Sequence, residues 1–322
     1  MLTQLNLESV RDRALLMRAM PTFAGVDDDS LALIAAHSRT RVFTPGAALN
    51  RENQPIDEVY AIVRGRVEVR RQGQVVQVPD PSPATVGLLP VLVRDNQGFD
   101  SIAVEETVAL ALPPQVLLDV LEEHFPVVRE LLRIGARALL GRLRAIGDRQ
   151  SLLGELLFAL PGGELAPAAG IGRGGRVEMV MRLRRIPLME TADLDAMFAI
   201  LDHQDEQVLA PGEALWRIGD VVDFTVMIES GRLRAEMPCC PPVILGPGMM
   251  AGRLESLASE PVRYQVVAEV ETRLLRIDMS GVMSVLESHF DLARKILAGV
   301  SAALLGLPPD QLVERVRRAG VR

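Results

Sequence analysis

The chain has 322 residues and a formal net charge of −7, and 48% of its residues are hydrophobic. This length suits two domains of about 150 residues, and this hydrophobic content excludes a disordered chain. The negative charge disfavours binding to nucleic acid and to anionic membrane surfaces. Aromatic residues make up only 3% of the chain, so we expect the cores to be built from aliphatic side chains and methionine.

We expect a cytoplasmic protein that does not insert into a membrane. No apolar stretch reaches the roughly 18 residues that span a bilayer, and residues 1–5 lack the basic and apolar regions of a signal peptide. Cys239 and Cys240 are adjacent, and two cysteines are too few for a secreted disulfide framework. Lys295 is the only lysine among 35 basic residues, which is typical of GC-rich codon usage and consistent with a bacterial protein.

The first half of the chain carries helix and strand signals in a fixed order. Capping residues precede a short helical pattern, and a Pro-Gly turn follows a strand. A period of two that Gly65 interrupts predicts a β-hairpin, and a long amphipathic helical pattern comes last. The expected elements are, in chain order, a helix at 26–35, a strand at 41–43, a turn at 44–46, a hairpin at 59–70 and a closing helix at 125–146.

The second half repeats this order. Its expected elements are a helix at 190–201, a strand at 207–209, a turn at 210–212, a hairpin at 226–235 and a closing helix at 290–305. Nine residues recur at a constant offset of 166, namely Pro21/Pro187, His37/His203, Pro45/Pro211, Gly46/Gly212, Leu49/Leu215, Asp57/Asp223, Ile62/Ile228, Gly65/Gly231 and Arg66/Arg232. From residue 120 onward the offset is 165. A repeat of this length indicates two copies of one globular domain.

We expect four segments. The first domain with its closing helix covers 1–150, and the second domain covers 179–306. Between them, 151–178 holds a short apolar helix and a Gly/Pro/Ala-rich linker. Residues 307–322 form a basic tail with one predicted helix, which is too little for a helix-turn-helix and could instead bind an acidic partner.

The second copy carries a recognisable motif after its first strand. Pro211-Gly212-Glu213 is followed by Gly219-Asp220 and by Asp223, close to the pattern PGExIxxxGDxxD, and Leu245-Gly246-Pro247-Gly248 comes later. These residues resemble the cyclic-nucleotide-binding domain family, which includes the catabolite activator protein and the regulatory subunits of protein kinase A. The resemblance covers nearly the whole chain. It implies a mainly β fold of two tandem antiparallel β jelly rolls, each with N-terminal and C-terminal helices.

The second copy departs from the family in the phosphate-binding cassette. In the family, a glutamate accepts the ribose hydroxyl and an arginine pairs with the phosphate. Here Arg253 stands at the glutamate position after Gly252, and Val262 stands at the arginine position. Arg263 is shifted by one residue, which in a strand turns its side chain to the opposite face, and Tyr264 adds bulk beside it.

The first copy departs further. After Gly87, Leu88 stands at the glutamate position, and Gln97 stands at the arginine position. Removing a buried charged partner of a phosphate costs about 2–5 kcal/mol. We therefore expect weak or absent binding of cyclic AMP and cyclic GMP by either copy.

A different anionic ligand is an alternative for the second copy. The candidate ligand or anion site consists of Gly252, Arg253, Glu255, Arg263 and Tyr264. The competing interpretation is that both arginines are solvated, or that they form ion pairs with Glu255 and Glu260.

No catalytic, metal or cofactor site is predicted. The four histidines recur as the pairs His37/His203 and His124/His289, which favours structural roles, and no histidine or cysteine has the spacing of a zinc motif. No phosphate-binding loop and no nucleophile–base constellation occurs.

The leading hypothesis is a non-catalytic interaction or scaffold protein with regulatory use, whose closing helices contact a protein partner or a second copy in a homodimer. The alternative is a sensor of cyclic nucleotide or another anionic ligand through an atypical pocket in the second domain. A third interpretation is a kinase-inhibiting subunit, but Met1–Arg18 lacks the Arg-Arg-x-Ser/Ala segment that such subunits carry before the first domain.

Overall fold

The computed structural model describes residues 7–23, 25–77, 84–93, 99–145, 176–184, 193–237 and 242–306. By its internal contacts the chain divides into residues 1–131 and 132–322. Most of the predicted helix and linker segment at 151–178 lies outside the described residues, which resume at Arg176, and so do Gln97, the cysteine pair and the C-terminal tail. The domain boundaries at 150, 178 and 306 therefore stay predictions.

The first unit is a β-sandwich with helices before and after it. Its helices are α1 (Val10–Arg18), the 3-10 helix η2 (Pro21–Phe23), α2 (Asp28–His37), α3 (Leu88–Val93) and α4 (Pro114–Glu123). Its strands are β1 (Arg39–Phe43), β2 (Ala48–Asn50), β3 (Val59–Arg64), β4 (Val67–Arg71), β5 (Gln74–Gln77), β6 (Ala84–Val86), β7 (Asp100–Ala103) and β8 (Thr107–Leu112). Helix α5 (Phe125–Ala145) begins in this unit and ends in the second.

The second unit repeats the arrangement. Its helices are α7 (Arg176–Leu183), α8 (Leu194–Asp202), α9 (Arg253–Ala258), α10 (Met279–Ser288) and α11 (Phe290–Gly306). Its strands are β9 (Gln204–Leu209), β10 (Ala214–Trp216), β11 (Phe224–Ser230), β12 (Leu233–Glu236), β13 (Val243–Leu245), β14 (Met250–Ala251), β15 (Gln265–Ala268) and β16 (Thr272–Asp278).

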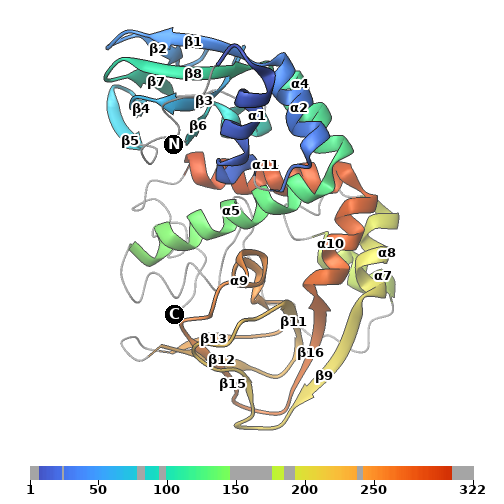
Figure 1. The fold of residues 1–322 in the computed structure, drawn as a ribbon. Coiled ribbons are helices and arrows are strands. Elements are labelled where there is room, and N and C mark those ends of the chain that lie inside the picture. Colours follow the sequence, from blue (N-terminus) through green and yellow to red (C-terminus); the bar gives the residue numbers. More distant parts are fainter. Residues whose placement is uncertain are drawn as a thin grey trace. The chain divides into compact units, whose positions relative to one another are not determined.

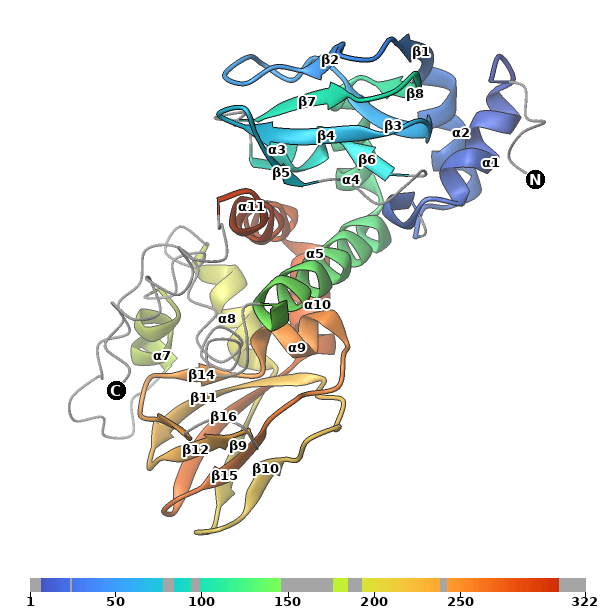
Figure 2. The same ribbon diagram turned by 90° about the vertical axis from the view of Figure 1, so that its left-hand side faces the viewer.

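Strand order makes both units jelly rolls. In the first unit the two antiparallel sheets run β1-β8-β3-β6 and β2-β7-β4-β5 (Figures 1 and 2). In the second they run β9-β16-β11-β14 and β10-β15-β12-β13, which is the same order one copy later. The predicted fold class, two tandem antiparallel jelly rolls with flanking helices, is confirmed.

The predicted hairpins around Gly65 and Gly231 are wrong. Strand β3 pairs with β6 and β8, whereas β4 pairs with β5 and β7, so Gly65 joins strands of opposite sheets. Gly231 joins β11 to β12 in the same way. A glycine with positive φ allows a sharp turn both in a hairpin within one sheet and at a corner between two sheets. The alternating pattern identifies the two strands but does not indicate which strands they pair with.

Both inter-sheet corners are closed by a buried threonine. Gly65 has φ +100°, and its Cα faces Thr107 so closely that an added Cβ would lie 2.5 Å from Thr107 Oγ1. At Gly231, with φ +91°, the corresponding distance to Thr272 Oγ1 is also 2.5 Å. Both threonines are 0% exposed. No residue with a Cβ fits either corner without moving the strand behind it.

The cores are not uniformly aliphatic. The core of the second jelly roll includes Trp216, Phe224 and Tyr264, with ring centroids 5.9–6.0 Å from Trp216. The core of the first is built mainly from Leu, Ile, Val and Ala, with Tyr60 as its buried aromatic residue. The expectation from composition is thus incomplete, because both units bury aromatic side chains, namely Phe23, Tyr60 and Phe99 in the first and Trp216, Phe224 and Tyr264 in the second.

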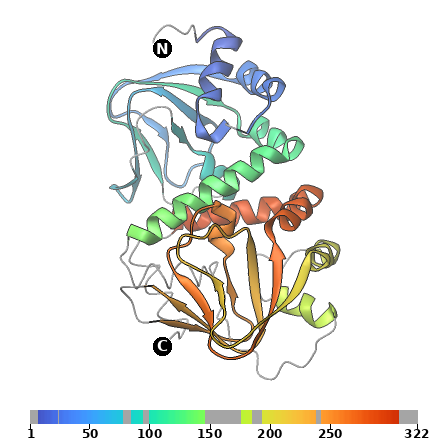
Figure 3. The same ribbon diagram turned by 60° about the horizontal axis from the view of Figure 1, so that its bottom comes forward.

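The last turns of α5 pack on α11 within the second unit, and Figures 1 and 3 show the two helices side by side. An added Cβ at Gly135 would lie 2.6 Å from Val300 Cγ1, so the backbones approach closely there. Arg142 donates a hydrogen bond to the carbonyl oxygen of Leu304, one of the last carbonyls of α11. Burial lowers the pKa of Arg142.

The corner glycines provide a test of the duplicated architecture. We expect Gly65→Ala and Gly231→Ala each to destabilise its own domain by about 2–4 kcal/mol, because left-handed strain adds to a backbone clash. Trp216 is the only tryptophan, so its fluorescence follows the second domain, while circular dichroism follows both. Gly73→Ala is the control, since Gly73 has φ +78° but open space around it. An equal loss in all three variants would contradict the clash.

Candidate functional site

The cassette of the second domain is a short helix between two left-handed residues. Strand β14 ends at Ala251, Gly252 with φ +81° is the N-cap of α9, and Ser259 with φ +52° is its C-cap. An added Cβ at Gly252 would lie 2.9 Å from the carbonyl oxygen of Phe224. The Ser256 hydroxyl donates back to the Gly252 carbonyl. The cassette backbone is therefore tightly held against β11 at its start.

A buried polar pair lies on the inner side of this cassette. The hydroxyl of Tyr264 donates to Glu255 Oε1 over 2.7 Å, and both residues are 0% exposed. The Tyr264 ring meets Trp216 edge-on at an interplanar angle of 68°. Val262, which is 1% exposed, belongs to the same core. The interior beside the cassette is thus occupied by side chains of the domain itself.

The structure brings three of the five candidate site residues together and separates a fourth. Gly252, Glu255 and Tyr264 meet at the cassette, whereas Arg263 is exposed between the buried Val262 and Tyr264. The outward orientation of Arg263 agrees with the sequence expectation, although residues 262–264 precede β15 and the chain bends at Arg263 and Tyr264. The side chain of Arg253 lies outside the described residues.

Two arginines of α5, which no motif in the sequence singled out, contact the far end of the same cassette. Arg144 Nη1 lies 2.6 Å from Glu260 Oε2, and Arg137 Nε donates to the carbonyl oxygen of Ala258 over 3.0 Å. These partners are more than 100 residues apart in sequence. One signal was present: the second copy has Ala302 and Pro309 at the positions that correspond to the two arginines.

The cassette of the first domain is apolar. Gly87 has φ +89°, and an added Cβ there would lie 2.9 Å from Asn50 Nδ2. Leu88 follows as the first residue of α3 and is 7% exposed, and Phe99, after the cassette, is 8% exposed. The Arg71 guanidinium lies 5.6 Å from the centre of the Phe99 ring. Leu88, which stands at the family's glutamate position, is therefore a core residue.

A second buried carboxylate lies at the start of β3. Glu58 accepts hydrogen bonds from Arg39 Nε at 2.7 Å and from Tyr60 Oη at 3.0 Å. Burial by itself would raise the pKa of Glu58, but the hydrogen bonds from Arg39 and Tyr60 and the charge of Arg41 outweigh it and lower that pKa. Burial, with the neighbouring Glu58, raises the pKa of Tyr60 to about 12. This cluster ties β1 to β3.

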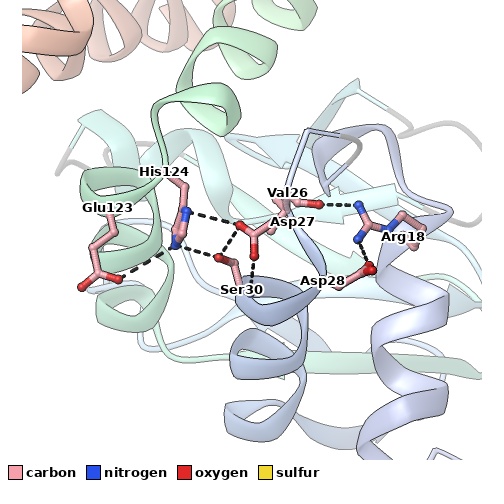
Figure 4. A network of polar contacts seen from close by, with 7 residues as sticks. All are labelled: Arg18, Val26, Asp27, Asp28, Ser30, Glu123 and His124. Atoms are coloured by element: carbon pink, nitrogen blue, oxygen red, sulfur yellow. Dashed lines mark hydrogen bonds and ion pairs between the residues drawn. The ribbon is translucent and has the colours of Figure 1, made fainter.

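A polar network at the helical end of the first domain joins α2 to the α4–α5 junction (Figure 4). Asp27 Oδ1 accepts the backbone N–H of Ser30 at 2.9 Å, and Oδ2 accepts the Ser30 hydroxyl at 2.6 Å. His124 Nε2 lies 2.7 Å from Ser30 Oγ, and Nδ1 lies 3.2 Å from Asp27 Oδ2. Hydrogen bonds from the Ser30 side chain and backbone lower the pKa of Asp27 to about 2.

This network is a helix cap and not a nucleophile–base arrangement. In a catalytic triad the serine donates to histidine, and the aspartate contacts the other ring nitrogen without touching the serine. Here the Ser30 hydroxyl donates to Asp27, and Ser30 is 4% exposed. The second copy has Ala196 in place of Ser30, and Asp193 makes no side-chain cap.

The described residues hold neither a candidate metal-binding cluster nor a helix suited to span a membrane. No group of three or more His, Cys, Asp or Glu side chains within that part of the chain is placed to hold a metal ion. None of the helices found there combines the length and apolarity that crossing a bilayer requires.

Comparison with known families agrees with the fold. The family model described as the cyclic nucleotide-binding domain matches residues 40–124 and 206–289, more than half of the chain. The chain belongs to this family and carries two tandem copies of its domain. No curated protein matches the chain in sequence.

Several solved structures resemble the chain in fold. The regulatory subunit of a cAMP-independent protein kinase A from Trypanosoma brucei is 16% identical over 88% of this chain and 90% of that chain, with a TM-score of 0.33. The regulatory domain of Toxoplasma gondii PKA with cAMP is 14% identical over 88% and 96%, also with a TM-score of 0.33. The N-terminal domain of a transcriptional regulator from Streptomyces coelicolor is 23% identical over 38% and 92%, with a TM-score of 0.36.

The side chain of Asp27 caps α2 and so contributes to the stability of the first domain, by an amount that depends on pH. Asp193, at the same position in the second domain, makes no side-chain cap. We expect Asp27→Ala to destabilise the first domain by about 1 kcal/mol at neutral pH, because two hydrogen bonds at the start of α2 are lost. Since the pKa of Asp27 is lowered, this contribution is present above pH 3.8 and is lost as the pH falls towards 2. Urea unfolding at several pH values measures it.

Asp193→Ala is the matched control, because Asp193 stands at the same position without a side-chain cap. We expect it to leave stability nearly unchanged at every pH. A loss as large as that of Asp27→Ala would contradict the assignment of the cap.

Proposed function

We propose that this chain is a non-catalytic regulatory or scaffold protein, and that neither of its cyclic-nucleotide-binding-like domains binds cyclic AMP or cyclic GMP usefully. One observation carries the proposal. Val262 stands where the family pattern has its phosphate-pairing arginine, and it is 1% exposed in the core of the second jelly roll. Tyr264, two residues further on, is fully buried in the same core.

The energetic reason is the charge of the ligand. A cyclic phosphate that leaves water needs a cation or several hydrogen-bond donors to replace its hydration. Val262 offers neither, and Arg263 is exposed to solvent. Losing one charged partner costs about 2–5 kcal/mol, which corresponds to a dissociation constant weakened by a factor of about 30 to several thousand.

A sensor of another anionic or acceptor-bearing ligand in the second domain is the second candidate. It is favoured by Trp216, which is 3% exposed beside Gly252 and whose Nε1 has no hydrogen-bond partner among the described residues. Buried donors are nearly always paired, so a ligand with an acceptor atom would satisfy this one. Gly252, the cassette glycine of the family pattern, has a positive φ and begins the cassette helix α9.

The proposal includes protein partners. Homodimerisation through the closing helix α5, however, would require its buried apolar residues to become exposed. Five apolar residues of α5 after residue 131 are buried, namely Leu132, Ala136, Leu139, Leu140 and Leu143. A two-helix seam between copies would have to expose them first. We therefore expect light scattering to give a monomer mass over a concentration series, and a dimer would point to another surface or to release of α5.

The ligand test is a thermal-shift titration with cyclic AMP, cyclic GMP and cyclic dinucleotides. A ligand that binds only the folded state raises the melting temperature by mass action, so we expect no shift for cyclic AMP or cyclic GMP. Low-micromolar binding of either would overturn the proposal. A shift with another ligand alone would favour the sensor.

A variant with restored anchors sharpens this test. Combining Arg253→Glu, Val262→Arg and Tyr264→Ala returns the two family side chains and removes the ring. We expect this variant to be less stable without ligand and to gain a shift with cyclic AMP. Arg263→Gln is the control, because an exposed side chain should change neither property.

A further inference from the structure

One sheet of the second jelly roll ends in a long strand whose outer edge is unpaired. The sheet runs β9-β16-β11-β14, so β9 has a neighbouring strand on one side only (Figure 1). Residues 204–209 pair with β16 in an unbroken antiparallel register. In such a pair, every second residue directs its N–H and C=O groups away from the neighbouring strand. Among the described residues, none supplies a hydrogen bond to these outward groups of β9.

Most other sheet edges in the described ranges are short or irregular. The edge strands β2, β5, β6, β10, β13 and β14 have two to four residues each. The pairings of β2, β5 and β10 also contain a register shift. Proteins commonly use short edge strands and bulges to keep other strands from pairing with an edge. With six residues and no register shift, β9 has neither protection.

The side chains of β9 combine two carboxylates with an exposed valine. Asp205 and Glu206 are exposed, and neither forms an ion pair within the part of the chain that the structure describes. Arg276 stands opposite Asp205 in the register, but its Nε donates to Asp278 Oδ1 at 3.0 Å. Val208 is 51% exposed. The edge therefore offers negative charge and apolar surface together.

The order of these side chains along β9 dictates which sequence fits it. Asp205 and Glu206 are adjacent and point to opposite faces of the sheet, whereas Glu206 and Val208 share a face. A strand paired with β9 therefore needs two adjacent basic residues, one for each carboxylate, and an apolar residue opposite Val208. Arg273 of β16, opposite Val208, disfavours a basic residue at that end. In antiparallel pairing, the partner reads apolar-any-basic-basic from its N-terminus.

The first domain has the opposite charge at the same place. Strand β1 is also a regular edge strand, of five residues, and its Val42 corresponds to Val208 and is 64% exposed. Arg39, however, stands at the position of Asp205. Like charges on neighbouring strands are destabilising, so β1 repels the basic segment that β9 attracts. The charge that suits a basic strand belongs to the second domain.

We propose that β9 is a docking edge for an extended basic segment of a partner protein, which adds to the sheet as a further strand. The backbone of this segment pairs with the outer edge of β9, and its two adjacent basic residues meet Asp205 and Glu206. Its apolar residue covers Val208. In strand addition of this kind, backbone hydrogen bonds supply affinity and alternate side chains supply specificity.

This inference rests on the proposed function, because it names the kind of partner that the scaffold or regulatory protein holds. Docking at β9 involves no nucleotide. Its test is therefore separate from the thermal-shift titration, and either one can fail while the other succeeds.

Fluorescence anisotropy with the full chain and the labelled peptide Thr-Val-Thr-Arg-Arg-Thr tests the docking edge. We expect saturable binding that the combined variant Asp205→Lys and Glu206→Lys weakens by about tenfold or more, because two attractions become repulsions. The neutral pair Asp205→Asn and Glu206→Gln should weaken binding by about two- to tenfold, and it keeps the test decisive if the lysines unfold the domain. Binding that neither pair weakens would overturn the proposal.

Glu271→Lys combined with Glu287→Lys is the matched control. Both residues are exposed acids of the second domain, and neither is ion-paired within the described ranges. The control changes the net charge as much as the lysine pair on β9 does, but away from the edge. We expect it to change the dissociation constant by less than about twofold. A loss equal to that of the β9 pair would overturn the docking edge.

Peptides N-methylated at every second residue separate strand addition from simple attraction between charges. The two such forms of the probe keep all side chains, but each loses the N–H donors along one edge. Only one edge faces β9, so we expect one form to bind like the probe and the other to bind about tenfold more weakly or worse. Equal binding of both forms and the probe would overturn strand addition.

Hydrogen exchange by mass spectrometry locates the bound peptide. We expect the amides of β9 to exchange more slowly with the probe than without it, because their outward N–H groups gain partners. The amides of β1 should be unaffected. Protection at another surface without protection of β9 would overturn the proposal.

Discussion

The hydrogen bond from Tyr264 to Glu255 is the interaction on which the interior of the second domain depends. Both residues are fully buried, and removing a donor from a buried polar group costs about 1–3 kcal/mol or more when that group is charged. To keep this donor, the tyrosine ring has to stay inside the jelly roll, where it packs against Trp216. The interior beside the cassette is therefore filled by side chains of the domain itself.

Much of the fold could be predicted because its helices and strands follow from local sequence patterns, and because these patterns occur in both halves of the chain. The helix expected at 125–146 is α5 at Phe125–Ala145, and the one expected at 290–305 is α11 at Phe290–Gly306. Their boundaries follow from helical periodicity alone. The hairpin at Gly65 failed because periodicity identifies strands without identifying their neighbours, and here the chain crosses between sheets.

The site was less predictable, because its contacts join residues that are far apart in sequence or that look alike in both copies. Motif position alone placed Gly252 and Arg263, and the one-residue shift of the arginine predicted that it would be exposed, although it lies in a bend before β15. Nothing local links Arg144 to Glu260. His124 and His289 end equivalent helices, but only His124 meets a serine and an aspartate, because the second copy has Ala196 where the first has Ser30. The two copies therefore share their strand order but differ in the polar contacts of their side chains.

The packing of α5 on α11 has a consequence for synthesis. Gly135 emerges from the ribosome 165 residues before Val300, the residue it packs against. At the usual pace of translation this interval lasts roughly 10–30 s. During that time the last turns of α5 lack the helix α11 that comes to pack on them at Gly135, so the nascent chain displays part of an apolar helix face. The chain therefore has a window during its own production in which chaperones, or neighbouring chains on the same messenger, compete for a surface that the finished protein conceals.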